Sequence, residues 1–219
     1  MIYLVGKTVL VAFASLFPVI NPVGTSLIFL TLTETADPQT RKILARKVAL
    51  NTIAFLTVLL LIGTYLLAVF GISVPIIQAA GGLVLAGMGW KLINQDPGES
   101  DSKNLASTSA AQSYVDKIFY PLTFPITVGP GGIAVVLTLS AHTRQHADWM
   151  SAAERQGGAF IGIVLMGLVV YLSFIYADSL VKKLGPAGTK ALMRMVAFLV
   201  ICIGAEISWN GIRTLITLK

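Results

Sequence analysis

FPVINPVGTSLIFLTLT, residues 17–33, is an apolar run nearly long enough to cross a membrane, yet two prolines and an asparagine interrupt it. Proline removes a backbone hydrogen-bond donor and drives the residue before it out of the helical region. Asn21, which precedes Pro22, is therefore predicted to be non-helical. We expect the first half of this helix to end near residues 17–20 and the second half to start near residues 24–26.

A second stretch, FPITVGPGGIAVVLTLS at residues 124–140, matches the first without a gap at an offset of 107 residues. Six of the 17 positions are identical, and they include a proline and a glycine at the same depth in each run. Gly129 before Pro130 predicts another break, with a helix end near residues 124–127 and a new start near residues 131–133. A weaker echo links residues 81–89 with residues 197–205. These matches predict an internal duplication.

The composition indicates a membrane protein. The chain has 219 residues, of which 55% are hydrophobic and 12% charged, and its mean hydropathy is +0.81. These values lie outside those of a soluble domain. A bilayer crossing takes about 20 residues. The stretches that are free of charge, apart from Glu206 in the last, cover residues 8–33, 48–90, 118–143, 156–177 and 195–212. The second is interrupted by GISVP at residues 71–75 and holds two crossings, so we expect six.

A long polar segment, residues 95–117, separates the two halves and is rich in Ser, Ala, Asp and Gly. We expect it to be a cytoplasmic linker between a first repeat, residues 1–94, and a second repeat, residues 118–219. Three crossings per repeat force the second copy to enter the membrane from the opposite face. The predicted fold is therefore an all-α membrane protein of six transmembrane helices, arranged as two inverted three-helix repeats in which helices 1 and 4 are discontinuous.

The distribution of cationic residues predicts the orientation in the membrane. Eleven of the 16 Lys and Arg residues fall in the loops between helices 1 and 2, 3 and 4, and 5 and 6, and five fall on the other side. The positive-inside rule then places both termini outside the cytoplasm. The pI of about 9.6 reports this orientation, and we expect no nucleic-acid partner. The single Cys202 excludes a disulfide within the chain and is predicted to be a small packing residue.

The two breaks form the predicted binding site. In hydrocarbon an unpaired backbone N–H or C=O costs several kcal/mol, so a broken helix persists only where something satisfies the freed groups. Donors at the start of the second half-helix suit a carboxylate, and carbonyls at the end of the first suit an ammonium group. The alternative is a kink that only improves packing. The predicted substrate-binding residues are Asn21, Pro22, Gly24, Thr25, Thr123, Thr127, Gly129, Gly131 and Gly132.

Three other polar residues in the crossings are candidates for coupling or for lining a cavity: Gln78, Glu206 and Asn210. Glu206 is the only acid well inside a crossing, where acids are rare and often functional. The alternatives are a neutral or water-facing Glu206 near the outer helix end, and an amide of Gln78 that joins two helices.

Small residues four apart predict close helix packing rather than chemistry, at Gly158–Gly162, Gly82–Ala86 and Gly204–Ser208. His142 and His146 lie together without a third ligand, so no metal site and no other cofactor is predicted. No nucleophile and base occur together in the crossings, so we expect no enzyme.

The chain resembles the MarC family of integral membrane proteins. The resemblance is carried by NPVG at residues 21–24 and PLTFPITVGPGGIA at residues 121–134, with AGG at residues 80–82 and NGI at residues 210–212. It implies a six-helix protein of the cell inner membrane, and transport of glycine, alanine and similar amino acids is known for some members. Relatives tend to carry Gln at the position of Glu206, so a role for this carboxylate across the family is not implied.

Together these patterns predict a secondary transporter of small neutral amino acids, which binds the zwitterion at mid-membrane between the broken helices. A coupling ion, either a proton or sodium, and a homo-oligomer are compatible with it. The alternatives are an ion or proton channel that uses Glu206 and the carbonyl ends, and a membrane scaffold protein with a dry, packed centre.

Overall fold

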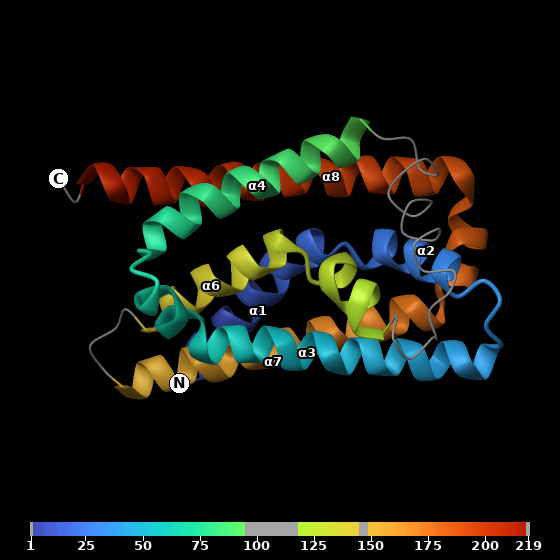
Figure 1. Ribbon diagram of the computed structural model, residues 1–219, viewed down its shortest axis with the longest axis horizontal. Helices are drawn as coiled ribbons and strands as arrows, with labels where there is room; N and C mark the ends of the chain where they lie inside the picture. Colours follow the sequence, from blue (N-terminus) through green and yellow to red (C-terminus); the bar gives the residue numbers. More distant parts are fainter. Residues whose placement is uncertain (1, 95–117, 145–148, 218–219) are drawn as a thin grey trace.

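The computed structural model describes residues 2–94, 118–144 and 149–217, and all of its regular elements are helices (Figure 1). The predicted linker, residues 95–117, and His146 lie outside the described residues. In chain order the helices are α1 (Ile2–Ile20), α2 (Pro22–Leu32), α3 (Pro38–Val69), α4 (Val74–Asn94), η1 (Ile118–Thr127), α6 (Pro130–Arg144), α7 (Trp149–Ile175) and α8 (Ala177–Thr217).

Five of the described helices are long and apolar enough to cross a membrane: α1, α3, α4, α7 and the part of α8 from Ala187 to Thr217. The pair η1 and α6 makes a sixth if it is counted as one span, although its two parts are bent by 70°. The expectation of an all-helical protein with about six crossings is therefore confirmed by length and composition. The turn between α3 and α4 falls inside GISVP, where Gly71 has a φ of 66°, so the second apolar stretch does hold two crossings.

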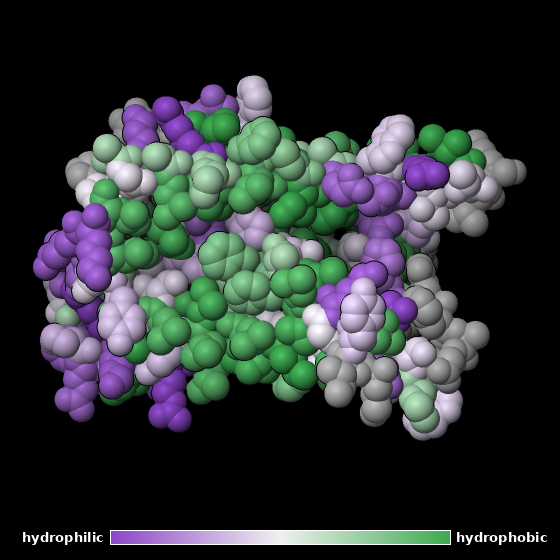
Figure 2. Space-filling model, turned by 180° about the vertical axis from the view of Figure 1, so that it is seen from behind, coloured by the Kyte–Doolittle hydropathy of each residue, from purple (hydrophilic) through white to green (hydrophobic). Residues whose placement is uncertain are grey.

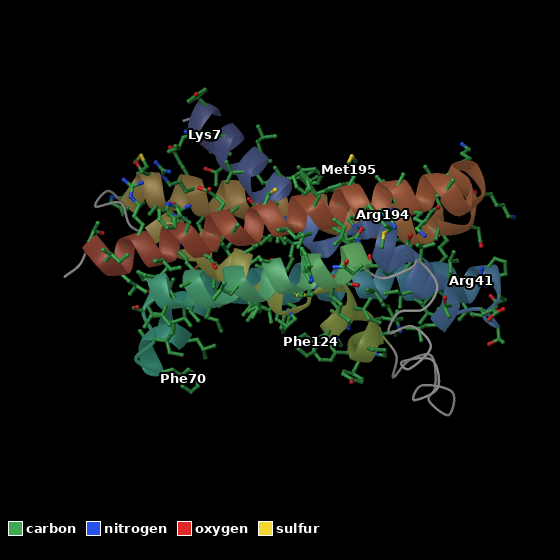
Figure 3. All side chains as sticks on the ribbon, turned by 90° about the horizontal axis from the view of Figure 1, so that it is seen from above. Lys7, Arg41, Phe70, Phe124, Arg194 and Met195 are labelled. Atoms are coloured by element: carbon green, nitrogen blue, oxygen red, sulfur yellow. The ribbon has the colours of Figure 1, made fainter. Side chains whose placement is uncertain are left out.

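The long helices run side by side, and the start of α1 and the end of α8 lie at the same end of the bundle (Figure 1). The turn between α3 and α4 is also at this end, which we name the terminal end. Figure 3 places Lys7 and Phe70 toward the terminal end and Arg41 at the opposite end. Arg41 donates to the carbonyl oxygen of Thr33 at 3.0 Å and pairs with Asp178 at 3.1 Å, so it joins the turn after α2 to the start of α8.

A band of hydrophobic side chains covers the middle of the molecule, with hydrophilic residues at both ends (Figure 2). The exposed tyrosine and tryptophan side chains of the described chain all lie within about two turns of a helix end, as expected for side chains at the two membrane interfaces. Those toward the terminal end are Tyr3, Tyr65, Trp149 and Trp209, and those toward the other end are Trp90, Tyr120 and Tyr176.

Glycines set the closest helix contacts. A methyl group added at Gly162 of α7 would lie 2.7 Å from Cβ of Ala12, so α1 and α7 touch almost backbone to backbone. At Gly204 of α8 it would lie 2.6 Å from the carbonyl oxygen of Gly82 in α4. The predicted small-residue contacts are thus confirmed. Cys202 was expected to pack internally, but it lies on the exposed face of α8, because Gly204 is the residue that turns toward α4.

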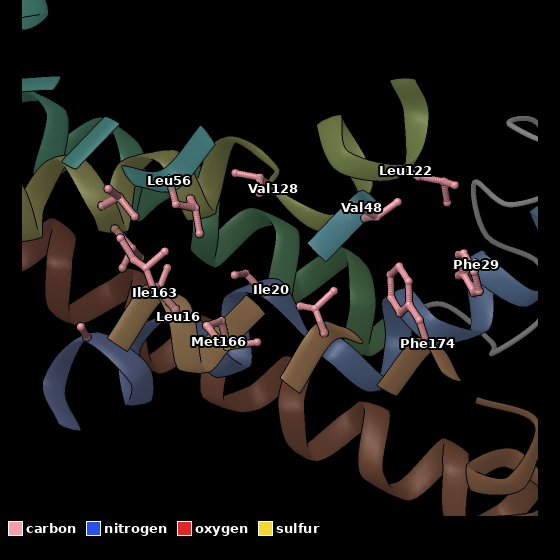
Figure 4. Packing of buried hydrophobic residues seen from close by; sticks show 14 of the residues in the cluster. Leu16, Ile20, Phe29, Val48, Leu56, Leu122, Val128, Ile163, Met166 and Phe174 are labelled. Carbon is pink, nitrogen blue, oxygen red and sulfur yellow. The ribbon is translucent and has the colours of Figure 1, made fainter. Parts of the chain in front are cut away.

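Larger apolar side chains fill the space between these contacts. Leu16, Ile20, Leu56, Val128 and Met166 are fully buried in one cluster at the centre of the bundle (Figure 4). The rings of Phe29 and Phe174 stack with centroids 4.4 Å apart and join α2 to α7.

Candidate functional site at the two helix breaks

The first break is a single residue. Asn21 has φ 49° and ψ 66°, in the left-handed region that asparagine tolerates better than most residues. Its side-chain oxygen accepts the N–H of Gly24 at 3.0 Å, so Asn21 is the N-cap of α2. Pro22 is buried at the first helical position, where its missing donor costs nothing. For this reason α2 starts at Pro22 and not near residues 24–26, while α1 ends at Ile20, as expected.

A methionine of α8 covers the first break. The amide nitrogen of Asn21 donates to the sulfur of Met193 at 3.7 Å. A methyl group added at Gly24 would lie 2.9 Å from the terminal carbon of the same methionine. Met193 could not be identified from the sequence, because a methionine in an apolar helix carries no signal that it contacts a polar residue 172 positions away.

The second break is wider. η1 is a π-type segment in which Tyr120 and Phe124 leave helical geometry, and α6 starts at Pro130 after the bend of 70°. The hydroxyl groups of Thr123 and Thr127 donate to the carbonyl oxygens five residues earlier, Ile118 and Leu122, each at 2.7 Å. α6 begins earlier than residues 131–133 because Pro130, like Pro22, suits the first position of a helix.

The two breaks lie next to each other. A methyl group added at Gly131, in the first turn of α6, would lie 3.2 Å from a methyl carbon of Val19, two residues before Asn21. The same group would press on Leu85 of α4, and Met88 of α4 lies beside Gly129. The structure therefore brings together the two groups of predicted site residues, with side chains from α4 and α8 around them.

The expectation that the N–H groups of Gly24 and Thr25 are free donors is wrong. The side chain of Asn21 takes the N–H of Gly24, and the carbonyl oxygen of Asn21 takes the N–H of Thr25 at 2.9 Å. The hydroxyl of Thr25 also donates to the carbonyl oxygen of Asn21, at 3.1 Å. Asparagine caps its own helix here, so the N–H groups of Gly24 and Thr25 are both satisfied within the break.

The second break differs in its donors. The N–H of Ile133 bonds to the carbonyl oxygen of Gly129 at 3.2 Å, which closes the first turn of α6. The N–H groups of Gly131 and Gly132 precede this bond and have no acceptor of their own in an isolated helix. Within residues 2–94, 118–144 and 149–217, no hydrogen bond to these two groups is found. Both glycines are buried.

The three other polar candidates do not lie at the breaks. Glu206 and Asn210 are on the exposed face of α8, where the amide of Asn210 donates to the carboxylate of Glu206 at 3.0 Å. Gln78 is buried beside Gly211 where α4 meets α8, which is the helix-contact alternative. These residues lie away from the breaks because of the orientation of α4 and α8 about their own axes, and hydropathy alone does not specify this orientation.

Several further polar side chains are completely buried and were not identified as site residues from the sequence, among them Ser26 and Thr52. The hydroxyl of Ser26 donates to the carbonyl oxygen of Val23 at 2.7 Å. The hydroxyl of Thr52 has no partner in the described part of the chain. Thr52 lies on α3 between Val48 and Leu56, which are in the central cluster. The sequence signal for a buried Thr52 is its spacing, because it lies four residues from Val48 and four from Leu56, and residues four apart share one face of a helix.

An apolar cavity of about 190 Å³ borders the second break between α4 and α6. Its lining residues are Ile77, Ala80, Gly81, Val84, Pro130, Ile133, Ala134 and Leu137. This lining suits a hydrocarbon group rather than a zwitterion. Among the described residues, no three His, Cys, Asp or Glu side chains come close enough to hold a metal ion.

Comparison with known proteins agrees with this helical membrane architecture. MJ1677, a membrane protein of Methanocaldococcus jannaschii, is 29% identical over 208 residues, which are 93% of this chain and 95% of that protein. YvbG of Bacillus subtilis is 29% identical over 201 residues, 92% of each chain. The inner membrane protein MarC of Escherichia coli is 27% identical over 207 residues, again 92% of each chain. No solved structure matches significantly.

A family model described as "MarC family integral membrane protein" matches residues 6–216. This range includes both breaks and every described helix span except the first few residues of α1 and the last of α8. The resemblance based on NPVG and the GPG of residues 129–131 is thus confirmed. The protein is a multi-pass membrane protein that belongs to the MarC family.

Proposed function

We propose that this protein is a secondary transporter of small neutral amino acids in the cell inner membrane, as MarC of Escherichia coli is by name an inner membrane protein. The observation that carries the proposal is the juxtaposition of two glycine-bearing helix breaks, Gly131 beside Val19, at the centre of a membrane bundle. Broken helices at mid-membrane are the usual binding sites of transporters built from inverted repeats.

The packing pattern supports inverted repeats. α1 packs on α7, as α6 packs on α3, so the first helix of each half contacts the second helix of the other. α8 covers the first break through Met193, and α4 covers the second through Leu85 and Met88. The third helix of each half therefore covers the break of the other half. The remaining large contacts, α3 with α7 and α4 with α8, join equivalent helices. A two-fold relation between the halves accounts for all of these pairs.

In this proposal the side-chain oxygen of Asn21 occupies the position of a substrate carboxylate oxygen. It already accepts the N–H of Gly24 at the positive end of α2. Rotation of the Asn21 side chain away from Met193 would transfer this donor to the substrate. The N–H groups of Gly131 and Gly132 add donors from the second half. The arrangement described above is then a closed conformation, and rocking of one repeat against the other opens it to either side.

The test uses the purified protein in proteoliposomes and measures uptake of radiolabelled glycine and alanine, with a proton or a sodium gradient applied in turn. We expect uptake that depends on the protein and saturates with substrate. The gradient that accelerates it identifies the coupling ion. No uptake of any small neutral amino acid under either gradient would overturn the proposal.

Gly131→Val should abolish uptake, because a side chain at Gly131 would fill the place where the two breaks meet, beside Val19. Gly87→Val is the matched control, since Gly87 faces open space on α4. Asn21→Asp keeps a capping oxygen but places a negative charge where the carboxylate binds, so it should also abolish uptake. Size-exclusion profiles of both variants test whether they are folded.

A membrane scaffold is the second candidate function. It is favoured by the packed centre, where Leu16, Ile20 and Val128 are fully buried. A scaffold predicts no saturable uptake in the same assay. The channel alternative loses its main support, because Glu206 does not lie at the breaks.

A further inference from the structure

A cavity of about 290 Å³ lies between α1, α6 and α7 at the terminal end of the bundle. Among the described residues that line it, Lys7, His142 and Arg155 are basic and none is acidic. The other lining residues are Leu4, Thr8, Val11 and Leu139. Lys7 precedes Asn21 by about 20 Å along α1, so this cavity is separate from the two breaks.

Close packing of α7 on α1 brings the cations Lys7 and Arg155 together. A methyl group added at Gly158 would lie 2.9 Å from both the carbonyl oxygen of Val5 and Cβ of Thr8. Arg155 is one turn before Gly158 on the same helix, so its side chain is held over the first turns of α1. His142 is one turn after the buried Leu139 and approaches the cavity from α6.

The cations in this cavity lack partners within the described residues. The Nε atom of Arg155 is buried and has no hydrogen-bond acceptor there. The ion pair found in the described chain joins Arg41 to Asp178 at the opposite end, and none is found for Lys7 or Arg155. The hydroxyl of Thr8 donates to the carbonyl oxygen of Leu4 at 2.9 Å. Like charges that converge on a cavity repel one another, and a buried donor without an acceptor is costly, so an anion would relieve both.

We propose that this cavity binds the phosphate group of an anionic ligand. Arginine presents a planar fork that bonds two phosphate oxygens at once, and lysine adds a second positive charge. Leu4, Val11 and Leu139 give one side of the cavity an apolar surface that suits the carbon chain next to a phosphate ester. Tyr3 and Trp149 lie at the same end, where aromatic residues mark the level of lipid headgroups. A phospholipid headgroup and a soluble phosphate share this chemistry, and the site does not depend on the proposed transport.

The test measures binding to the full-length protein purified in detergent. One arm titrates phosphatidylglycerol, with phosphatidylcholine for comparison, and counts bound lipid by native mass spectrometry. The other arm follows radiolabelled inorganic phosphate by equilibrium dialysis. We expect saturable binding with one ligand per chain in at least one arm. A response in the lipid arm alone assigns the site to a headgroup, and a response in the phosphate arm alone assigns it to a soluble phosphate.

Arg155→Gln should raise the Kd at least tenfold, because it removes the charge and the guanidinium fork but keeps a polar, uncharged side chain. Lys7→Gln tests the same site at an exposed position, and it decides the outcome if Arg155→Gln does not fold. Arg213→Gln removes an exposed cation of α8 outside the cavity and should leave the Kd unchanged. No binding in either arm, an equal Kd in wild type and the folded site variants, or the same loss in Arg213→Gln would overturn the proposal.

Discussion

Asn21 shows how one residue can both interrupt a membrane helix and cap the helix that follows. Its left-handed backbone separates α1 from α2, and its side chain caps the helix that follows. In hydrocarbon the polar groups at such a break need partners, and Asn21 supplies three of them from its own amide and carbonyl. The break therefore costs less than two unpaired helix ends would.

The order of stability among Asn21 variants tests this role. Asn21→Ala loses the cap, which is worth about 1 kcal/mol, and places alanine in the left-handed region, which alanine tolerates less well than asparagine does. Asn21→Gly loses the side-chain bond but accepts the backbone conformation. We expect Asn21→Ala to lower the free energy of unfolding more than Asn21→Gly does, measured by denaturation in mixed detergent micelles. The reverse order would contradict the capping role.

The pair α4 and α8 is held by small residues along its whole length. Gly82, Gly89, Gly204 and Gly211 each face backbone or Cβ atoms of the other helix. Lipid tails are as apolar as the helices, so close van der Waals packing has to hold the pair together.

Gly204→Leu should push α4 and α8 apart and lower the free energy of unfolding by about 1–3 kcal/mol, the usual cost of overpacking. Gly157→Leu is its control, since that glycine faces open space on α7. Thermal unfolding of both variants gives the comparison. Equal melting temperatures would show that the glycines of this interface are dispensable.

The carboxyl of Asp37 caps the start of α3 and titrates. Hydrogen bonds from the backbone N–H of Thr40, at 2.7 Å, and from its hydroxyl, at 2.8 Å, lower the pKa of the Asp37 carboxyl. Asp37 precedes the membrane-spanning part of α3. A carboxyl whose pKa is lower in the folded state stabilises the fold above its unfolded pKa, and this contribution is lost as the pH falls through the folded value.

We therefore expect the wild type to lose stability below about pH 4, near the ordinary pKa of aspartate, more steeply than Asp37→Asn does. Asparagine still caps the helix but does not titrate in this range. Unfolding measured at pH 3, 4 and 6 tests the difference, and parallel pH profiles would exclude a contribution from Asp37.

At the scale of the whole molecule, the start of α1 and the end of α8 lie at the same end of the bundle (Figure 1). Which end faces the cytoplasm remains a prediction from the distribution of Lys and Arg. It places Lys42 in the cytoplasm and Ser73 outside.

Single cysteines test this orientation on a Cys202→Ser background. A maleimide that does not cross membranes should label Ser73→Cys in intact cells, because this residue is exposed in the turn after α3. It should label Lys42→Cys, which is also exposed, only after the membrane is permeabilised. The opposite pattern would reverse the predicted topology.

Much of the fold could be predicted because its signals are local. Apolar stretches of membrane length predicted the helices, and Pro22 and Pro130 predicted where the backbone leaves helical geometry, to within a few residues. Proline acts on its own backbone and on the residue before it, whatever surrounds them. The exact starts were missed because a proline also suits the first turn of a helix.

The sequence by itself determined the solvent, the helices and the places where they break, since hydropathy and proline act over one or a few neighbouring residues. The tertiary structure alone decided that the two breaks lie next to each other and that Asn21 accepts the N–H groups at the start of α2. It also decided that Glu206 and Cys202 face outward, and that Lys7, His142 and Arg155 line one cavity. These facts depend on the rotation and contact of each helix. Helices that are apolar on nearly every side carry little periodic signal of either.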